Sequence, residues 1–173
     1  LGGKRMRPIM LLMGYSLFKD DFKQALPAAY AVEIFHNFSL VHDDMMDEAP
    51  VRRGQPTVHE KWNMSTGILS GDAMLVQAYE YLLELEDKSN LAAIIKTFNR
   101  FAIEVCEGQQ YDMNFEQRND VTIEEYLKMI ELKTSVLLAG AMKIGALIAK
   151  ADTQSVKHIY EFGRNVGLAF QIQ

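Results

Sequence analysis

Three aspartates, Asp43, Asp44 and Asp47, lie close together in an otherwise apolar stretch. On a helix, residues i and i+4 share a face, so Asp43 and Asp47 point the same way, and Asp44 lies about 100° round the axis. Carboxylates among apolar residues are costly unless a cation neutralises them. Because Mg²⁺ binds carboxylate, water and phosphate oxygens, the spacing indicates a magnesium–phosphate site, with a solvated acidic helix end as the alternative.

Two short basic segments lie on either side of this acidic run. The first contains Lys4, Arg5 and Arg7, and the second is Arg52-Arg53-Gly54. Arginine suits phosphate because its planar fork binds two oxygens at once. A cavity that held the acidic run and both basic segments would suit divalent metal ions and a diphosphate. Taken alone, the first segment could also be a solvated basic terminus.

Composition narrows the class of protein. The 173 residues are 49% hydrophobic, which predicts one folded domain with a substantial core. A net charge of −5 and short basic clusters argue against a nucleic-acid-binding protein, and the apolar runs fall short of the ~20 residues that span a membrane. The single cysteine, Cys106, cannot form an intrachain disulfide, fits a reducing compartment, and is expected in the core.

The distribution of prolines and helix-start signals predicts an all-α, single-domain bundle of long antiparallel helices. The last proline is Pro56, helix formers dominate beyond it, and period-two alternation is nowhere sustained. Asn63 or Ser65, and a Thr122–Glu125 capping box, are among the predicted helix starts. The predicted helices cover 5–19, 27–48, 64–86, 90–117, 122–150 and 153–172, and the predicted loops cover 20–26, 49–62, 87–89 and 118–121.

The ordered motifs of the chain resemble those of the trans-isoprenyl diphosphate synthases, or polyprenyl synthetases. They are Gly3-Lys4-Arg5-Met6-Arg7-Pro8, the segment 36–47, Arg52-Arg53-Gly54, Gly71-Asp72, the segment 108–112, Lys133-Thr134 and the segment 167–171. The resemblance spans nearly the whole chain and implies the isoprenoid synthase type I fold. It implies that an allylic diphosphate ionises and that isopentenyl diphosphate attacks the carbocation, which requires stabilisation of the leaving group in a water-excluded cavity.

The resemblance also implies a role for individual residues. Asp43 and Asp47 would hold Mg²⁺, for which Mn²⁺ could substitute, and Asp44 would support them. The remaining roles are substrate binding for Lys4, Arg7, His36 and Arg53 at isopentenyl diphosphate, and for Arg52, Lys133, Thr134 and Gln171 at the allylic diphosphate and reacting carbons. Lys133 counts among the catalytic residues with the three aspartates. Phe38 and Ser39 would limit the product to C15 or C20, with Phe38 as the main stop.

Several residues keep two interpretations. Lys133 lies among apolar residues, where a diphosphate would satisfy its charge. Gln109 and Asp112 are either a polar network beside the site or a buried pair that orders their helix. His42 is expected to be structural or to support the aspartates.

The resemblance implies further properties of the whole protein. A helix before this chain and a second aspartate-rich motif after Gln173 would complete the domain of which residues 1–173 form part, so we expect the chain alone to offer half of the metal site and to transfer little or no prenyl group. It also implies a cytoplasmic homodimer. The alternatives are a non-catalytic subunit of a heteromeric synthase and a class I terpene cyclase, although a cyclase has no use for the Lys4–Arg7 segment and His36.

Overall fold

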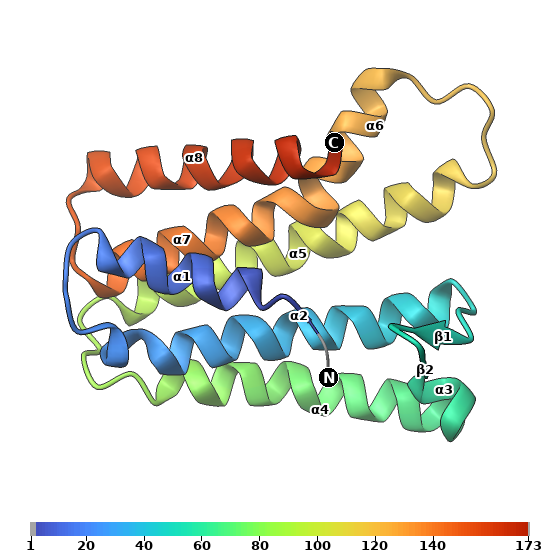
Figure 1. Cartoon of the computed structure of the whole chain (residues 1–173), viewed down its shortest axis with the longest axis horizontal. Coiled ribbons are helices and arrows are strands. Elements are labelled where there is room, and N and C mark those ends of the chain that lie inside the picture. The colour runs from blue at the N-terminus through green and yellow to red at the C-terminus, as the bar shows by residue number, and fades with distance from the viewer. Residues whose placement is uncertain (1–2, 173) are drawn as a thin grey trace.

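The computed structural model describes residues 3–172, and Leu1, Gly2 and Gln173 lie outside that range. The elements that follow, in chain order, are α1 (Met6–Ser16), η1 (Phe22–Ala25), α2 (Leu26–Met46), β1 (Val51–Arg52), β2 (Gln55–Pro56), α3 (Val58–Lys61), α4 (Met64–Leu83), α5 (Leu91–Phe115), α6 (Ile123–Ile130), η2 (Glu131–Ser135), α7 (Val136–Ile148) and α8 (Thr153–Ile172). Figure 1 shows the long helices running along one axis in alternating directions. The predicted all-α bundle is confirmed.

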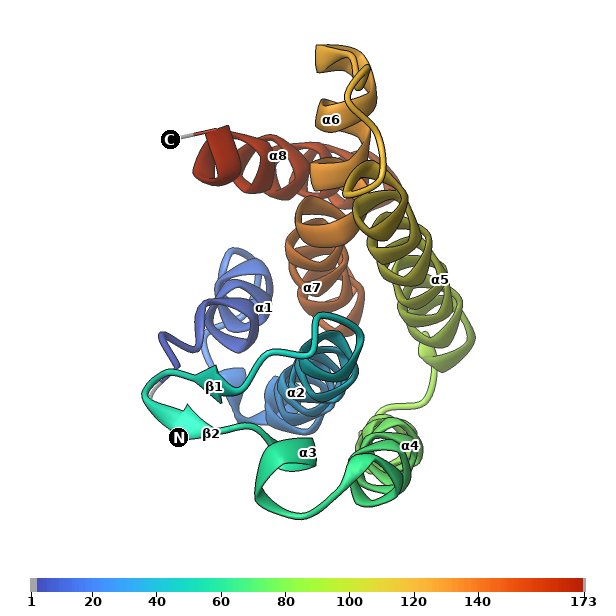
Figure 2. The same cartoon turned by 90° about the vertical axis from the view of Figure 1, so that its right-hand side faces the viewer.

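Helices α2 and α7 lie at the centre of the bundle. Figure 2 shows them enclosed by α1, α4, α5 and α8. Helix α2 packs against α1 and α4, while α7 packs against α1, α5 and α8. Short connections join the ends of consecutive antiparallel helices, as in other helix bundles. Residues from α1, α2 and η2 are thereby brought close together.

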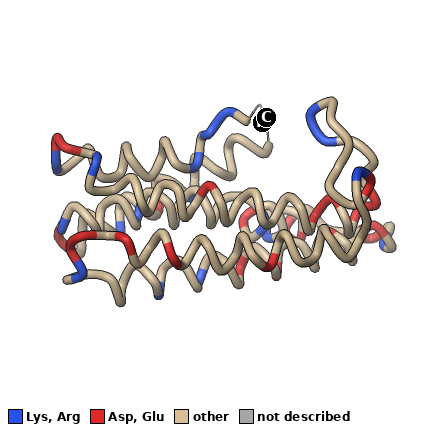
Figure 3. The backbone as a smooth tube through the Cα atoms, turned by 90° about the horizontal axis from the view of Figure 1, so that it is seen from below, with Lys and Arg blue, Asp and Glu red and all other residues tan. Residues whose placement is uncertain are grey.

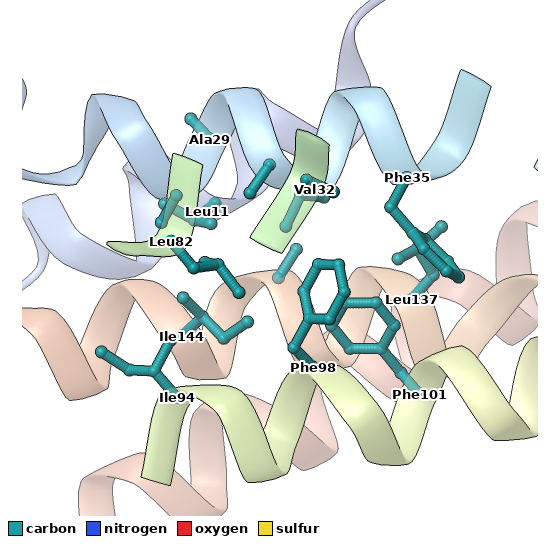
Figure 4. Close-up of a cluster of buried hydrophobic side chains, with 14 of the residues drawn as sticks. Leu11, Ala29, Val32, Phe35, Leu82, Ile94, Phe98, Phe101, Leu137 and Ile144 are labelled. Atoms are coloured by element: carbon teal, nitrogen blue, oxygen red, sulfur yellow. The ribbon is translucent and has the colours of Figure 1, made fainter. Parts of the chain in front are cut away.

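The main hydrophobic cluster brings together aliphatic and aromatic side chains of α1, α2, α4, α5 and α7. In Figure 4, Phe35 of α2 points toward Phe98 and Phe101 of α5. Its ring centroid lies 5.3 Å from that of Phe98 and 5.4 Å from that of Phe101, in edge-to-face packing. All three rings are almost fully buried. This cluster fixes the face of α2 that carries Phe38 and Asp43.

Polar caps begin the helices where the sequence predicts. The Asn63 side chain accepts a hydrogen bond from the Thr66 backbone N–H at 2.8 Å and starts α4. Thr122 and Glu125 form the predicted capping box at the start of α6. These caps satisfy backbone donors that the first helical turn leaves without partners.

Two segments differ from the prediction. The helix expected over 122–150 is interrupted by η2, a π-helical turn, between α6 and α7. The loop expected over 49–62 contains the β1–β2 hairpin and the short helix α3. Arg53 and Gly54 at its tip both have positive φ, 53° and 76°. Two positive φ values match a type I′ hairpin turn, which a search for sustained alternation does not detect.

The charged residues do not form a single stripe in the described part of the chain. Figure 3 shows Asp and Glu interspersed with Lys and Arg over the backbone. Among residues 3–172, none of the helices has both the length and the apolar character required to cross a bilayer.

Candidate active site

Two neighbouring cavities, of about 360 and 370 Å³, share three lining residues. These residues are Arg7 of α1, His36 of α2 and Thr134 of η2. All three are among the predicted substrate-binding residues, and the fold brings them together from distant parts of the sequence. These three residues, called the partition below, lie where the two cavities adjoin.

The first cavity is strongly basic. Its lining adds Lys4, Arg5 and Arg53 to Arg7, and it includes one end of the apolar α8 face at Val166 and Phe170. The carboxylate Glu33 also lines it and pairs with Arg5. An anion with several negative oxygens would suit these cations.

Two side chains of the partition, Arg7 and His36, have lowered pKa values. Burial lowers the pKa of the Arg7 guanidinium, and its Nε is buried without a hydrogen-bond partner in residues 3–172. Burial, followed by the charges of Arg7, Arg53, Arg52 and Arg5, lowers the pKa of His36 to about 3. His36 is therefore neutral near pH 7, and Arg7 has a donor free for an anion.

The lining of the second cavity is part polar and part apolar. Asp43, Lys133 and Thr134 provide polar groups. The apolar residues are Phe35, Phe38, Leu40, Met46, Val105, Met113 and Leu137. Ser39 also lines this cavity, and its hydroxyl donates to the His36 carbonyl at 2.8 Å. A ligand with a charged head and a hydrocarbon tail would match this division.

The hairpin turn separates two consecutive arginines. Arg53 lines the first cavity. Arg52 donates from Nε to Asp44 Oδ1 at 2.6 Å and from Nη2 to Asp43 Oδ2 at 3.0 Å. The predicted allylic diphosphate ligand Arg52 thus binds carboxylates in this structure, because Asp44 is buried and needs a cation close by.

Lys133 has two carboxylate partners. Its Nζ donates to Asp112 Oδ2 at 2.5 Å and lies 3.3 Å from Asp43 Oδ1. Burial lowers the pKa of Lys133, but these two acids outweigh burial, and the pKa is raised overall. The positive charge of Lys133 is therefore balanced by two carboxylates of the chain itself. Asp112 and Gln109 have two interpretations, a polar network beside the site and a buried pair that orders their helix. The contact between Asp112 and Lys133 fits the polar network. Nε2 of Gln109 is buried without a partner in the described residues.

The π-helical turn η2 presents Lys133 and Thr134 to the cavities. A Cβ at Gly108 of α5 would lie 2.3 Å from the Lys133 backbone nitrogen, and a Cβ at Gly167 of α8 would lie 2.6 Å from Ser135 Cα. Both glycines allow neighbouring helices to approach the turn more closely than a side chain would permit. Such single π turns inside helices are frequent at functional sites.

The predicted metal ligands, Asp43 and Asp47, lie at the C-terminal end of α2. Residues 3–172 hold no group of three or more His, Cys, Asp or Glu side chains placed to bind one metal ion. However, Asp43 Oδ1 is buried and accepts no hydrogen bond in the described residues, and the Lys133 ammonium lies 3.3 Å from it. Burial, and next the charge of Asp43, raises the pKa of Asp47. Hard oxygen donors crowded by like charge fit Mg²⁺, which would complete its shell with water and phosphate oxygens.

Other predicted residues lie elsewhere. Gln171 is exposed near the end of α8 and lines neither cavity. The expectation that Cys106 is a core residue is wrong, because it is exposed and lines the second cavity. Glu33 was missed as a site residue, although its position three residues before His36 places both on one face of α2.

Comparison with known sequences gives matches over nearly the whole chain. The sequence model of the family described as polyprenyl synthetase matches residues 1–173. The chain is 44% identical over 172 residues to a geranylgeranyl diphosphate synthase of Methanosarcina mazei, covering 99% of this chain and 53% of that protein. It is 46% identical over 174 residues to a geranylgeranyl diphosphate synthase of Saccharolobus solfataricus, covering 99% of this chain and 52% of that protein.

Solved structures agree with the sequence comparison. A geranylgeranyl pyrophosphate synthase crystal structure matches with a TM-score of 0.94 and 53% identity, over 98% of this chain and 52% of that chain. The geranylgeranyl pyrophosphate synthetase of Pyrococcus horikoshii matches with a TM-score of 0.95 and 41% identity, over 99% of this chain and 53% of that chain. The chain therefore spans about half the length of the curated relatives it matches.

Proposed function

The chain belongs to the polyprenyl synthetase family, and from this we propose that it forms part of a trans-prenyltransferase. The proposed enzyme condenses an allylic diphosphate with isopentenyl diphosphate to a C15 or C20 product. The observation that carries the proposal is the pair of cavities that share Arg7, His36 and Thr134. A carbon–carbon bond between two diphosphate substrates requires their reacting carbons to be held next to each other, and two adjoining cavities would provide this.

The first cavity is proposed to bind isopentenyl diphosphate. Lys4, Arg7 and Arg53 would hold its oxygens, and the buried Nε of Arg7 would gain the acceptor that it lacks. Neutral His36 would donate one hydrogen bond without adding repulsion between the arginines. The apolar residues of α8 would cover the hydrocarbon portion and keep water away.

The second cavity is proposed to bind the allylic diphosphate, with its tail along Phe38 and Ser39. Lys133 would stabilise the departing diphosphate, and Arg52 would do so after exchanging its carboxylate partners for phosphate oxygens. Thr134, which lines both cavities, would lie beside the reacting carbons. When bound at Asp43 and Asp47, Mg²⁺, or Mn²⁺ in its place, would supply positive charge that neutralises the leaving group.

Homodimer formation in the cytoplasm is part of the proposal. Helices α4 and α5 lie at the outside of the bundle in Figure 2. They carry exposed large hydrophobic residues, namely Ile68, Leu69, Val76, Leu83 and Ile103. Apolar faces of this kind favour burial against a partner. Sedimentation equilibrium that returned the monomer mass at micromolar concentration would contradict a dimer.

The central test uses the full-length protein that carries this chain. Incubation with allylic substrate should give a longer prenyl diphosphate only when isopentenyl diphosphate and Mg²⁺ are added. Product without isopentenyl diphosphate would indicate a cyclase, and no product would indicate a non-catalytic subunit. Residues 1–173 alone are expected to show little or no transfer, since the second aspartate-rich wall would be missing.

A matched pair of variants tests the assigned site. Asp43→Asn removes a charge that contacts both Arg52 and Lys133, and we expect kcat to fall about 10²–10³-fold. Asp20→Asn changes an exposed carboxylate in the loop after α1 and should leave kcat unchanged. Equal activity of the two variants would overturn the role of Asp43.

A further inference from the structure

The ring of His42 lies against the predicted chain-length residue. The centroids of His42 and Phe38 are 4.8 Å apart in an edge-to-face arrangement. Phe38 also contacts Phe35, at 5.5 Å, so it is held between one ring a turn earlier and one ring a turn later on α2. All three rings line the second cavity. The position of Phe38 therefore depends on where the His42 ring lies.

Helix α4 fixes the other side of the His42 ring. The Nε2 atom of His42 lies 3.4 Å from the Ile68 carbonyl oxygen. A Cβ at Gly71 would lie 2.2 Å from that Nε2 and 2.5 Å from Cδ2, closer than real Cβ atoms approach. The imidazole occupies its position only because residue 71 has no side chain. Gly71 thus packs directly against the Nε2–Cδ2 edge of the imidazole, and it does not line the second cavity.

We propose that His42 is a positioning residue for Phe38, and that the absence of a side chain at Gly71 sets the depth of the second cavity. The inference rests on the proposed function, in which this cavity holds the prenyl tail. Close-packed interiors transmit a displacement from one side chain to the next. A push on His42 from α4 moves the Phe38 ring into the cavity, and removal of the His42 ring releases it.

Two substitutions should therefore shift product length in opposite directions. His42→Ala in the full-length protein should lengthen the main product by one isoprene unit, since the cavity gains the volume of a ring. Gly71→Ala should shorten it by one isoprene unit, since the new Cβ displaces the far end of the imidazole toward Phe38. The double variant should give the long product of His42→Ala, because the methyl group added at position 71 then has no ring to displace.

Gly67→Ala is the matched control. Gly67 lies one turn before Gly71 on α4, is also buried, and also faces α2. A Cβ there would lie 2.4 Å from the Met45 sulfur, which is the flexible part of a different side chain. This variant should keep the wild-type product length. Its melting temperature also shows how much a methyl group between α2 and α4 costs without acting on His42.

The outcomes separate this inference from the proposed function. If wild-type protein makes prenyl diphosphates, and Gly71→Ala matches Gly67→Ala in product length, the positioning role of His42 is wrong. If wild-type protein makes none, the proposed function fails. Crystal structures of His42→Ala and Gly71→Ala then still test the inference. In His42→Ala the Phe38 ring should move away from the cavity, into the space left by the imidazole. In Gly71→Ala the Phe38 ring should move toward the cavity. An unmoved Phe38 ring in both variants overturns it.

Discussion

Arg52 and Asp44 form a short ion pair beside the predicted metal ligands, with Nε 2.6 Å from Oδ1. The Asp44 side chain is 8% exposed, so its charge is held within the protein. The same guanidinium reaches Asp43 through Nη2. One arginine on a two-residue strand therefore neutralises two carboxylates on a neighbouring helix, and it competes with any cation for them.

Replacing Arg52 should make the protein more responsive to Mg²⁺. Arg52→Gln leaves Asp43 and Asp44 without their shared cation and should destabilise the chain by about 1–3 kcal/mol in metal-free buffer. Added MgCl₂ should raise the melting temperature more in this variant than in wild type, because the carboxylates are open to the ion. Arg118→Gln, which removes an exposed pair with Glu125, is the control. Equal magnesium shifts in all three proteins would contradict the competition.

Because of His36, the free energy of unfolding should fall as the pH drops into the mildly acidic range. Its pKa is about 3 in the folded chain against 6.5 for an ordinary histidine. Between these values the unfolded chain binds a proton that the folded chain does not, so stability falls as the pH drops through this window. The loss approaches about 1.4 kcal/mol per pH unit below pH 6.

His36→Gln isolates this contribution from that of the carboxylates. Urea unfolding of wild type and variant should be compared from pH 7 to about pH 4.5, inside the window that the lowered pKa opens, and wild type should lose stability more steeply. His158→Gln, on α8, replaces a histidine in an exposed pair with Gln154 and should follow wild type. Parallel curves for wild type and His36→Gln would show that His36 titrates normally.

Phe38→Ala should lengthen the product by at least one isoprene unit. Phe38 is 9% exposed and lines the second cavity, so removing its ring extends the space available to the tail. Phe98→Leu is a useful comparison, because Phe98 is fully buried against Phe35 but lines neither cavity. Chromatography of the products should show a change for Phe38→Ala alone. Similar product profiles for both variants would exclude Phe38 as the stop.

Gly108→Ala should disturb the π-helical turn and displace Lys133. Its Cβ would meet backbone atoms of Lys133, which cannot move aside as a flexible side chain can. We expect a loss of about 1–3 kcal/mol in unfolding free energy and a larger fall in kcat than in substrate affinity. Gly67→Ala meets only the Met45 side chain and should cost less. A Gly108→Ala protein with wild-type kcat would show that the turn tolerates the methyl group.

The sequence predicts the helical elements of the fold better than the contacts between them. Helix periods, the Asn63 cap and the Thr122 capping box are local signals, and the structure reproduces them. The π-helical turn depends on Gly108 and Gly167 from other helices, so no local pattern predicts it. Likewise, the pairing of Arg52 with Asp44 joins a hairpin strand to α2, and no pattern within one helix predicts it.

The charge of Lys133 shows the same limit. The sequence indicates a costly lysine that needs a partner, but only the fold reveals that Asp112 and Asp43 supply one. Asp112 comes from α5 and Asp43 from α2, helices that meet η2 from different directions. Contacts between segments far apart in the chain are invisible to spacing along one helix.

The partition of Arg7, His36 and Thr134 means that the two cavities are not independent compartments. A ligand in either cavity touches the same three side chains, so it meets a partition already altered by its neighbour. If one ligand changes the equilibrium affinity of the other by some factor, the second ligand changes the affinity of the first by the same factor. Titrating inorganic diphosphate with and without an allylic analogue would then measure one coupling free energy, which describes the cooperativity between ligands in the two adjoining cavities.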